Sequence, residues 1–188
     1  MIFYTLGTQL SFGRMTRAVD DWCAARGRDD VFGQISDPGE DGYRPRNFEW
    51  VDRIAPSDFD DRFNSADFII AHAGMGSIIT AQDLNKLIVV MPRRAHLNEH
   101  RNDHQYETVR HLAGRPGLLV AMDDSELPDI LDEAVKLAPE WAARAASPYA
   151  DPGLIDAIRR EIAGAKQPQP QRSPRQFLAR LSLRHTVS

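Results

Sequence analysis

The chain has 188 residues, of which 42% are hydrophobic and 27% charged, and its formal net charge at pH 7 is −4. This length and composition suit one globular domain with a real core and exclude a disordered chain. The longest apolar runs, residues 68–71 and 87–91, are much too short to cross a bilayer. The first residues lack a basic region followed by an apolar segment of signal-peptide length, so we expect a cytoplasmic protein.

The charged residues are distributed unevenly along the chain. Residues 166–188 carry five basic residues and no acid, whereas residues 1–165 hold 18 basic and 27 acidic residues. The acidic body is not expected to attract nucleic acid by its charge. The single cysteine, Cys23, allows no internal disulfide, and its place in an apolar helical pattern favours a buried structural role over a nucleophilic one.

The hydrophobic pattern predicts strands that alternate with helices. In chain order, we expect strands at residues 2–6, 31–35, 48–51, 68–71, 87–91 and 117–121, and helices at residues 12–27, 57–63, 77–86, 102–112 and 124–137. This alternation predicts an α/β fold with a Rossmann-like, doubly wound parallel sheet. Residues 1–165 are expected to form this domain.

Residues 166–188 are expected to form a separate, flexible basic tail. Pro168, Pro170 and Pro174 lie in its first part. In the part that follows, the apolar residues would share one face of a helix and the basic residues would lie on another side. Such a segment either lies on an anionic membrane or a membrane partner, or is simply a disordered end.

The turn after the strand at residues 68–71 is the clearest candidate binding site. Gly74 and Gly76 allow positive φ and a close approach of a ligand to the backbone. A helix that opens at Ser77, capped by its hydroxyl, would direct free N–H groups at an anion such as a diphosphate. His72 before the turn and Thr80 one helical turn later would converge on the same point, at the carboxyl end of a strand.

Two commoner phosphate-binding motifs do not fit this turn. A dinucleotide-binding fingerprint needs a third glycine where Ile79 stands, and a Walker A loop needs a Gly-Lys-Ser/Thr sequence that is missing here. The turn therefore favours neither NAD nor ATP, and we expect no cofactor.

The loop at residues 93–105 is a second polar cluster. His96, His100 and His104 are spaced by four, and on a continuous helix they could ligate zinc together with neighbouring acids. Leu97 is the only large apolar residue in this stretch, so the segment lacks the apolar stripe that would hold it as a helix. We therefore predict no metal site and keep a metal-dependent hydrolase as an alternative.

Five segments, taken in order, carry a resemblance to known enzymes. They are residues 3–10 (FYTLGTQL), 66–67 (AD), 72–77 (HAGMGS), 90–94 (VMPRR) and 99–105 (EHRNDHQ). With them the sequence resembles the C-terminal, nucleotide-sugar-binding half of family-28 glycosyltransferases, most closely the small subunits of two-subunit bacterial exopolysaccharide glycosyltransferases. The resemblance covers about residues 1–138 and implies one half of the GT-B architecture.

The resemblance implies a donor site on these segments. The glycine turn would hold the donor diphosphate, the Asp-His-Gln element would contact the sugar or ribose, and the turn after the first strand would face the cleft. Arg93 or Arg94 would help bear the charge of the leaving diphosphate, and His72 would be a catalytic-site contact but not the base. The predicted substrate-binding residues are Gly7, Thr8, Gly74, Met75, Gly76, Ser77, Thr80, Arg93, Arg94, Glu99, His100, Asn102, Asp103, His104 and Gln105.

The sequence departs from the family pattern at two places. Thr80 stands where related enzymes often carry an acid that grips the ribose, so ribose contact is left open. Asn85-Lys86-Leu87 replaces the usual Gly-Lys-Pro, and Asn85 can adopt the left-handed conformation in place of glycine.

The implied function is transfer of a hexose-type sugar from a UDP-sugar to a lipid-linked saccharide acceptor in exopolysaccharide biosynthesis. The catalytic base normally comes from the other half of such enzymes, so we expect a membrane-bound, acceptor-binding partner subunit that holds the protein at the inner face of the membrane. A non-catalytic nucleotide-sugar-binding protein is a further alternative.

Overall fold

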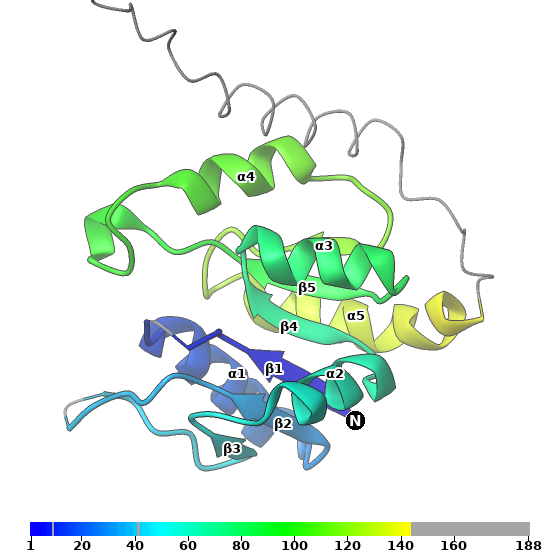
Figure 1. Cartoon of the computed structure of the whole chain (residues 1–188), viewed down its shortest axis with the longest axis horizontal. Coiled ribbons are helices and arrows are strands. Elements are labelled where there is room, and N and C mark those ends of the chain that lie inside the picture. Colours follow the sequence, from blue (N-terminus) through cyan, green and yellow to red (C-terminus); the bar gives the residue numbers. More distant parts are fainter. Residues whose placement is uncertain (9, 41, 144–188) are drawn as a thin grey trace, which may run out of the picture. The chain divides into compact units, whose positions relative to one another are not determined.

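The computed structural model describes residues 1–8, 10–40 and 42–143, and these form a six-stranded parallel sheet with helices on both faces (Figure 1). The strands are β1 (Ile2–Thr5), β2 (Val31–Gln34), β3 (Glu49–Val51), β4 (Ile69–His72), β5 (Ile88–Met91) and β6 (Leu118–Val120). The helices are α1 (Gly13–Arg26), α2 (Pro56–Ser65), α3 (Met75–Asp83), α4 (His104–Leu112) and α5 (Leu127–Ala142), with a 3₁₀ turn η1 (Ala95–Leu97). The predicted α/β fold is confirmed; the predicted tail lies outside the described residues.

The strand order β3-β2-β1-β4-β5-β6 places β1 and β4 at the centre. The chain winds outward in one direction from β1 to β3 and in the other from β4 to β6, so the order reverses between the two central strands. In open parallel sheets this switch point, at the carboxyl ends of the strands, is where ligands bind.

Alternate residues of the strands pack against different helix layers. Tyr4 and its neighbours on the same side of the sheet join one apolar cluster with α1 and α5. On the opposite side, Phe3 packs edge-on against Phe59 and Phe63 of α2, at ring-centre distances of 5.3 and 6.3 Å. In Figure 1, α2 and α3 lie on the near side of the sheet and α1 and α5 on its far side. Both faces are thus covered, as the apolar strands require.

The helix ends follow local chemistry. α1 ends at Gly27, which has a left-handed φ of 60°, and Asn85 adopts a φ of 51° just after α3, as predicted. The helix predicted at residues 57–63 begins one residue earlier, at Pro56, whose ring fixes a helical φ.

The free cysteine and the helix lengths agree with the sequence-based expectations. Cys23 is 1% exposed, and burial raises the pKa of its thiol to about 12, which keeps it protonated and unreactive. None of the described helices is both long and apolar enough to span a membrane.

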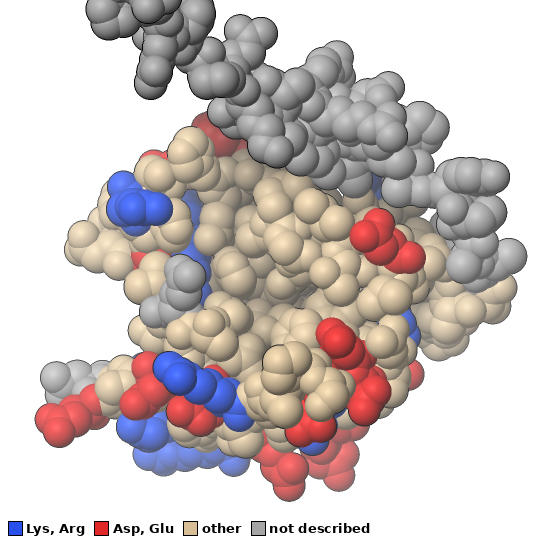
Figure 2. Space-filling model, in the orientation of Figure 1, with Lys and Arg blue, Asp and Glu red and all other residues tan. Residues whose placement is uncertain are grey.

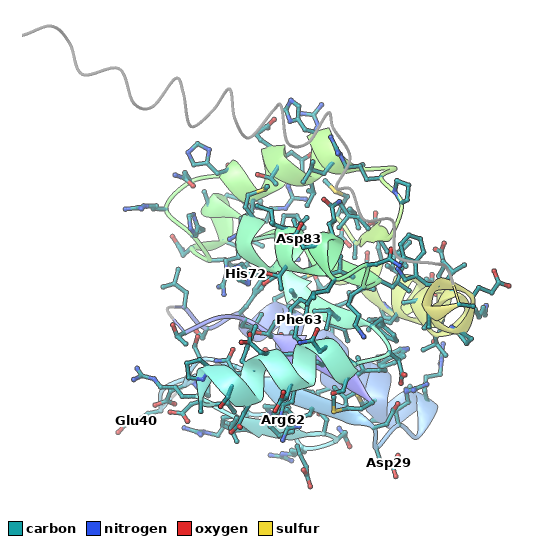
Figure 3. All side chains as sticks on the ribbon, turned by 45° about the vertical axis from the view of Figure 1, so that its right-hand side comes forward. Asp29, Glu40, Arg62, Phe63, His72 and Asp83 are labelled. Carbon is teal, nitrogen blue, oxygen red and sulfur yellow. The ribbon has the colours of Figure 1, made fainter. Side chains whose placement is uncertain are left out.

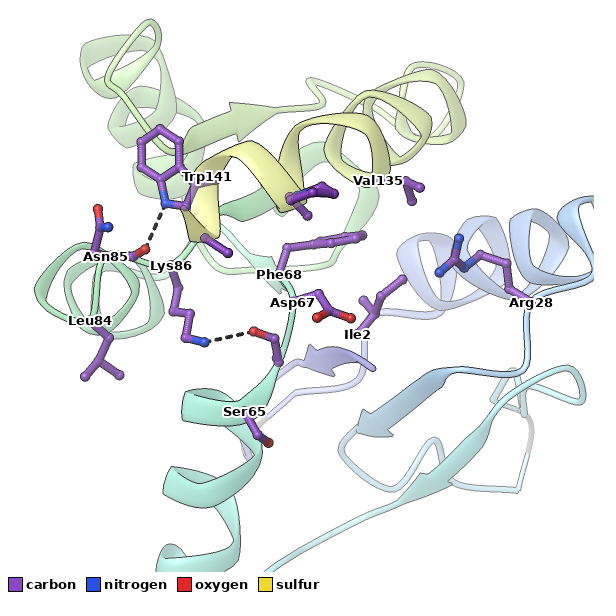
Figure 4. A pocket seen from close by; sticks show the side chains of 14 residues that line it. Ile2, Arg28, Ser65, Asp67, Phe68, Leu84, Asn85, Lys86, Val135 and Trp141 are labelled. Carbon is purple, nitrogen blue, oxygen red and sulfur yellow. Dashed lines mark hydrogen bonds between the residues drawn. The ribbon is translucent and has the colours of Figure 1, made fainter. Parts of the chain in front are cut away.

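A hollow of about 580 Å³ lies at the amino edge of the sheet, where β1, β4 and β5 begin (Figure 4). Two hydrogen bonds brace it: Lys86 Nζ donates to the Ala66 carbonyl at 2.9 Å, and Trp141 Nε1 donates to the Asn85 carbonyl at 2.8 Å. The first bond joins the segments just before β5 and β4, and the second joins the end of α5 to the segment before β5. The Asn85-Lys86 segment is therefore structural, and it lies at the edge of the sheet opposite to the predicted binding turn.

Candidate functional site

The loops that follow β1 and β4 touch at the carboxyl edge of the sheet. The two strands are paired neighbours, with Thr5 opposite Ala71. Gly7 follows β1 with a φ of +68°, and a Cβ built on it would lie 3.7 Å from Cε1 of His72. Figure 3 shows His72 at the end of the sheet from which α3 starts. The two predicted site segments are therefore brought together.

The glycine turn opens a helix two residues earlier than predicted. Gly74 is the N-cap of α3, with φ −83° and ψ 136°, and Gly76 lies inside the first helical turn. Neither glycine uses the positive φ that glycine allows, since Gly74 is extended and Gly76 is helical. The N–H groups of Met75, Gly76 and Ser77 belong to the first turn and have no partner within the helix.

Gly74 is required for a different reason from the predicted one. A Cβ at this position would overlap Nε2 of His72, so the imidazole occupies the space that a side chain would take. A Cβ at Gly76, in contrast, would meet nothing within 4 Å. The space above the first turn of α3 is therefore open at Gly76 and closed by His72 at Gly74.

The hydroxyl groups of α3 differ from the prediction as well. Ser77 does not cap the helix: it occupies the third helical position, and its hydroxyl makes no hydrogen bond with the described residues. Thr80 Oγ1 donates to the Gly76 carbonyl at 2.9 Å, so its proton is engaged while its lone pairs stay available. Ser77 can thus donate to a ligand near the N–H groups, whereas Thr80 can only accept.

His72 is held in its neutral form by its surroundings. Burial, followed by the charge of Arg93 and by His100, lowers its pKa to about 4, and the neighbouring Thr5 backbone only partly opposes this. Nδ1 is buried and makes no hydrogen bond with the described residues. At neutral pH the ring therefore offers a ligand a neutral hydrogen-bonding group and no positive charge.

The lowered pKa of His72 predicts a pH-dependent stability. In the unfolded chain the imidazole takes up its proton near pH 6.5, but in the folded protein only near pH 4. The unfolded state thus binds the extra proton between these values, and the free energy of unfolding should fall by about 2–3 kcal/mol as the pH drops from 6.5 to 4. Urea unfolding of the wild type and of His72→Gln at pH 7 and pH 4.5 measures this contribution.

A second histidine provides the control for that measurement. His111 is exposed on α4, and His111→Gln should keep the wild-type difference between the two pH values. A difference that survives in His72→Gln would show that other groups cause the acid sensitivity.

The structure places the Arg93 side chain inside the protein. The residue is only 2% exposed; its guanidinium donates to the carbonyls of Leu10 and Ser11 and lies 4.6 Å from the centre of the Phe12 ring. Both terminal nitrogens are therefore committed to the β1–α1 loop, and direct contact with a diphosphate is not supported. The sequence showed an arginine after a strand but not which way its side chain turns.

Glu99 is likewise engaged within the protein. Its carboxylate accepts from Arg14 Nε and Nη2 at 2.8 and 2.9 Å and from the Arg94 N–H at 2.9 Å. The Arg94 guanidinium stacks 3.9 Å from the Tyr106 ring centre and donates to the Met122 carbonyl at 3.0 Å. Glu99 thus ties α1 to the loop after β5 and does not project as a free ligand group, while Arg94 is half-buried at its edge.

The remaining predicted residues lie between η1 and the first turn of α4. Asp103 Oδ1 accepts from the Ala95 N–H at 2.9 Å, and Gln105 Oε1 accepts from the Arg93 N–H at 3.2 Å. His100 Nδ1 lies 3.0 Å from Asn102 Oδ1, and this contact orients the His100 imidazole and the Asn102 amide. His104 is exposed at the first position of α4. His104 and the amide nitrogen of Gln105 keep hydrogen-bonding capacity for a ligand.

The three histidines of this loop do not share one helix face. The 3₁₀ turn η1 ends at Asn98, whose φ of 57° reverses the backbone, and α4 begins only at His104. The described residues contain no group of three or more metal-ligating side chains. The geometry required for the hydrolase alternative is thus missing from the part of the chain that the structure describes.

A cavity beside Gly7 was not predicted from the sequence. It has a volume of about 280 Å³ and is lined by Gly7, Thr8, Gln34, Ile54, Pro56, Phe59 and Asp60. Its walls come from the ends of β1 and β2 and from the start of α2, so no contiguous motif marks it. The cavity shares Gly7 with the candidate site and lies between the ends of β1 and β2 and the start of α2.

The surface charge adds a constraint on what the site can bind. Figure 2 shows acidic side chains gathered over α2, where Asp58, Asp60 and Asp61 are exposed. This face would repel an anion at long range. An anionic ligand at the carboxyl edge must therefore rely on the local field of the α3 N-terminus.

Comparisons with known proteins agree with this architecture. The crystal structure of MurG from Acinetobacter baumannii matches with a TM-score of 0.55 and 16% identity, over 84% of this chain and 49% of that one. The glycotransferase of kitacinnamycin matches with a TM-score of 0.54 and 20% identity, over 87% of this chain and 39% of that one. A search of curated proteins found no significant match.

These likenesses show the fold: the domain matches one half of GT-B glycosyltransferases and spans at most about half the length of the two solved structures. The model of the glycosyltransferase family 28 C-terminal domain matches residues 39–149, which is more than half of the chain. The chain therefore belongs to the glycosyltransferase family 28 C-terminal domain family.

Proposed function

We propose that this domain binds a UDP-sugar and supplies the donor half of a glycosyltransferase that transfers a hexose-type sugar. The observation that carries the proposal is the open first turn of α3, where the N–H groups of Met75, Gly76 and Ser77 lack helical partners beside the free Ser77 hydroxyl. A helix N-terminus with this exposure binds phosphate groups, and it stabilises the charge that develops on a leaving diphosphate.

The neighbouring features suggest where the other parts of the donor lie. The cavity beside Gly7 and Thr8 has apolar walls from Ile54 and Phe59, which suits the nucleoside, and it shares Gly7 with the site around His72. His104 and Gln105 at the start of α4 would contact the sugar or ribose, and Thr80 would accept from a ribose hydroxyl. His72 would hydrogen-bond the donor as a neutral group.

Calorimetric titration of the purified chain tests donor binding. We expect UDP and UDP-sugars to bind, UMP to bind at least about tenfold more weakly, and uridine more weakly still, because each lost phosphate removes charge-assisted hydrogen bonds. ADP serves as the control for the base. No binding of UDP or of any UDP-hexose would contradict the proposal.

The sugar contacts are tested separately from the phosphate contacts. His104→Ala and Gln105→Ala should weaken UDP-sugar binding by about 3- to 10-fold and change the preference among UDP-sugars, since each removes one hydrogen bond. Binding of UDP itself should change much less. Equal losses for UDP and UDP-sugar would place these residues at the phosphates or show a general structural effect.

We also propose that the acceptor side comes from a membrane-bound partner subunit, and that the acceptor is a lipid-linked saccharide in exopolysaccharide synthesis. Support comes from the length match, since the chain corresponds to no more than about half of the solved GT-B enzymes. It also comes from His72, whose pKa of about 4 makes its imidazole a weak base. Copurification followed by a transfer assay with the captured partner tests this. Binding without transfer in the presence of the partner would instead favour a non-catalytic nucleotide-sugar-binding role.

A further inference from the structure

We infer that Arg93 is a positioning residue of the donor site: its buried side chain fastens the loop between β1 and α1 to the end of β5. This loop carries Gly7 and Thr8, which line the cavity of about 280 Å³, and Gly7 also lies next to His72 at the end of β4. The inference rests on the proposed function, because the position of the loop matters to activity only if a donor binds beside it.

The guanidinium grips three consecutive residues at the far end of the loop. Nη1 donates to the Ser11 carbonyl and Nη2 to the Leu10 carbonyl at 2.7 Å. Cζ of Arg93 lies 4.6 Å from the centre of the Phe12 ring. A planar fork with two parallel donors suits this arrangement, and a lysine ammonium cannot reproduce it. The last residues before α1 are therefore fixed by one side chain from another strand.

The near end of the same loop is fixed independently. The Gly7 carbonyl accepts from Gln34 Nε2 at 3.1 Å and from Ser36 Oγ at 3.0 Å. Between these anchors Thr8 is exposed, and the described loop residues belong to no helix or strand. The loop is thus held at both ends, and Arg93 makes the contacts at the end next to α1.

Burying the Arg93 guanidinium costs free energy, so a contribution to stability does not by itself explain why an arginine stands at this position. No carboxylate in the described part of the chain forms an ion pair with Arg93, and burial lowers the pKa of its guanidinium. An apolar residue of similar volume is often as stabilising as a buried charge. What the guanidinium provides is geometric, because its two terminal nitrogens fix the carbonyls of Leu10 and Ser11. Independently of the side chain, the backbone N–H of Arg93 binds Gln105 Oε1 and links the end of β5 to the start of α4.

Two substitutions separate the geometry from the charge. Arg93→Met removes both, whereas Arg93→Lys keeps the charge and loses the fork. In Arg93→Met, and to a smaller extent in Arg93→Lys, amide hydrogen exchange of residues 6–8 and 10–12 should accelerate at least about tenfold while β1 and β4 stay protected. UDP-sugar affinity should fall by about 10-fold in Arg93→Met. The pKa of His72, followed by NMR, should rise in Arg93→Met but stay low in Arg93→Lys, because the Arg93 charge lowers it.

Arg26→Met provides the matched control. Arg26 ties the other end of α1 to α5 through Asp132 at 2.6 Å, away from the loop. Loop exchange and affinity should not change in this variant. The inference is overturned if a folded Arg93 variant keeps wild-type loop exchange or affinity, or if Arg26→Met reproduces its effects. If the wild type itself binds no UDP, the proposed function fails, while the exchange measurement still decides whether Arg93 holds the loop.

Discussion

A Gly76→Val, Ser77→Ala double variant should lose at least about 100-fold in UDP-sugar affinity and remain folded. The alanine removes the free hydroxyl, and the valine enters the open space beside the N–H groups of the first turn. Charge-assisted hydrogen bonds contribute about 1.5–3 kcal/mol each, so the loss of two corresponds to this factor. Calorimetric titration with UDP and a UDP-hexose measures it.

The single variants and a neighbouring glycine sharpen this test. Ser77→Ala alone should cost about tenfold, since only one charge-assisted hydrogen bond, of about 1.5 kcal/mol, is lost. Gly74→Ala should act differently: its Cβ overlaps His72 Nε2, so it should displace the imidazole and lower stability, and His72→Ala in the same chain should relieve that cost. A folded double variant with wild-type affinity would show that the turn is only structural.

Gly117→Ala should lower the free energy of unfolding by about 3 kcal/mol. Gly117 has a φ of +78°, which costs a residue with a Cβ about 1–2 kcal/mol. Its Cβ would also lie 2.5 Å from Cζ2 of Trp141, and overpacking of this kind costs about 1–3 kcal/mol. Urea unfolding measures the change, which should appear in the midpoint and leave the slope unaltered.

Gly114→Ala is the matched control for the contact with Trp141. Gly114 has a similar φ of +83°, but a Cβ there would meet nothing within 4 Å. This variant should lose only the backbone term, about 1 kcal/mol. Equal losses at both positions would mean that Trp141 moves aside freely and that backbone strain accounts for the whole effect.

Local sequence patterns were sufficient for the architecture. The alternation of short apolar runs with helical patterns predicted all six strands and their parallel, doubly wound arrangement. The left-handed conformation of Asn85 and the burial of Cys23 were predicted too. These features depend on residues that lie within one or two helical turns of each other, which is why periodicity and turn chemistry reveal them.

The details of the site needed the contacts between distant segments. The start of α3 moved from Ser77 to Met75, and Gly74 proved to make room for the His72 ring rather than to adopt positive φ. A sequence pattern shows that glycine is present but cannot show which side chain fills the space above it. The exact first residue of a helix depends on such packing more than on propensity.

The sequence by itself determined the succession of strands and helices along the chain, the fold class and the place of the glycine turn at the end of β4, because these follow from local hydrophobic periodicity. Only the tertiary structure decided the direction of each polar side chain. Arg93 and Glu99 stand in a polar loop that reads as a ligand site, yet they bind carbonyls of the β1–α1 loop and Arg14 on α1. Their partners lie 82 to 85 residues away in the chain, and a contact over that separation is set by the packing of the sheet.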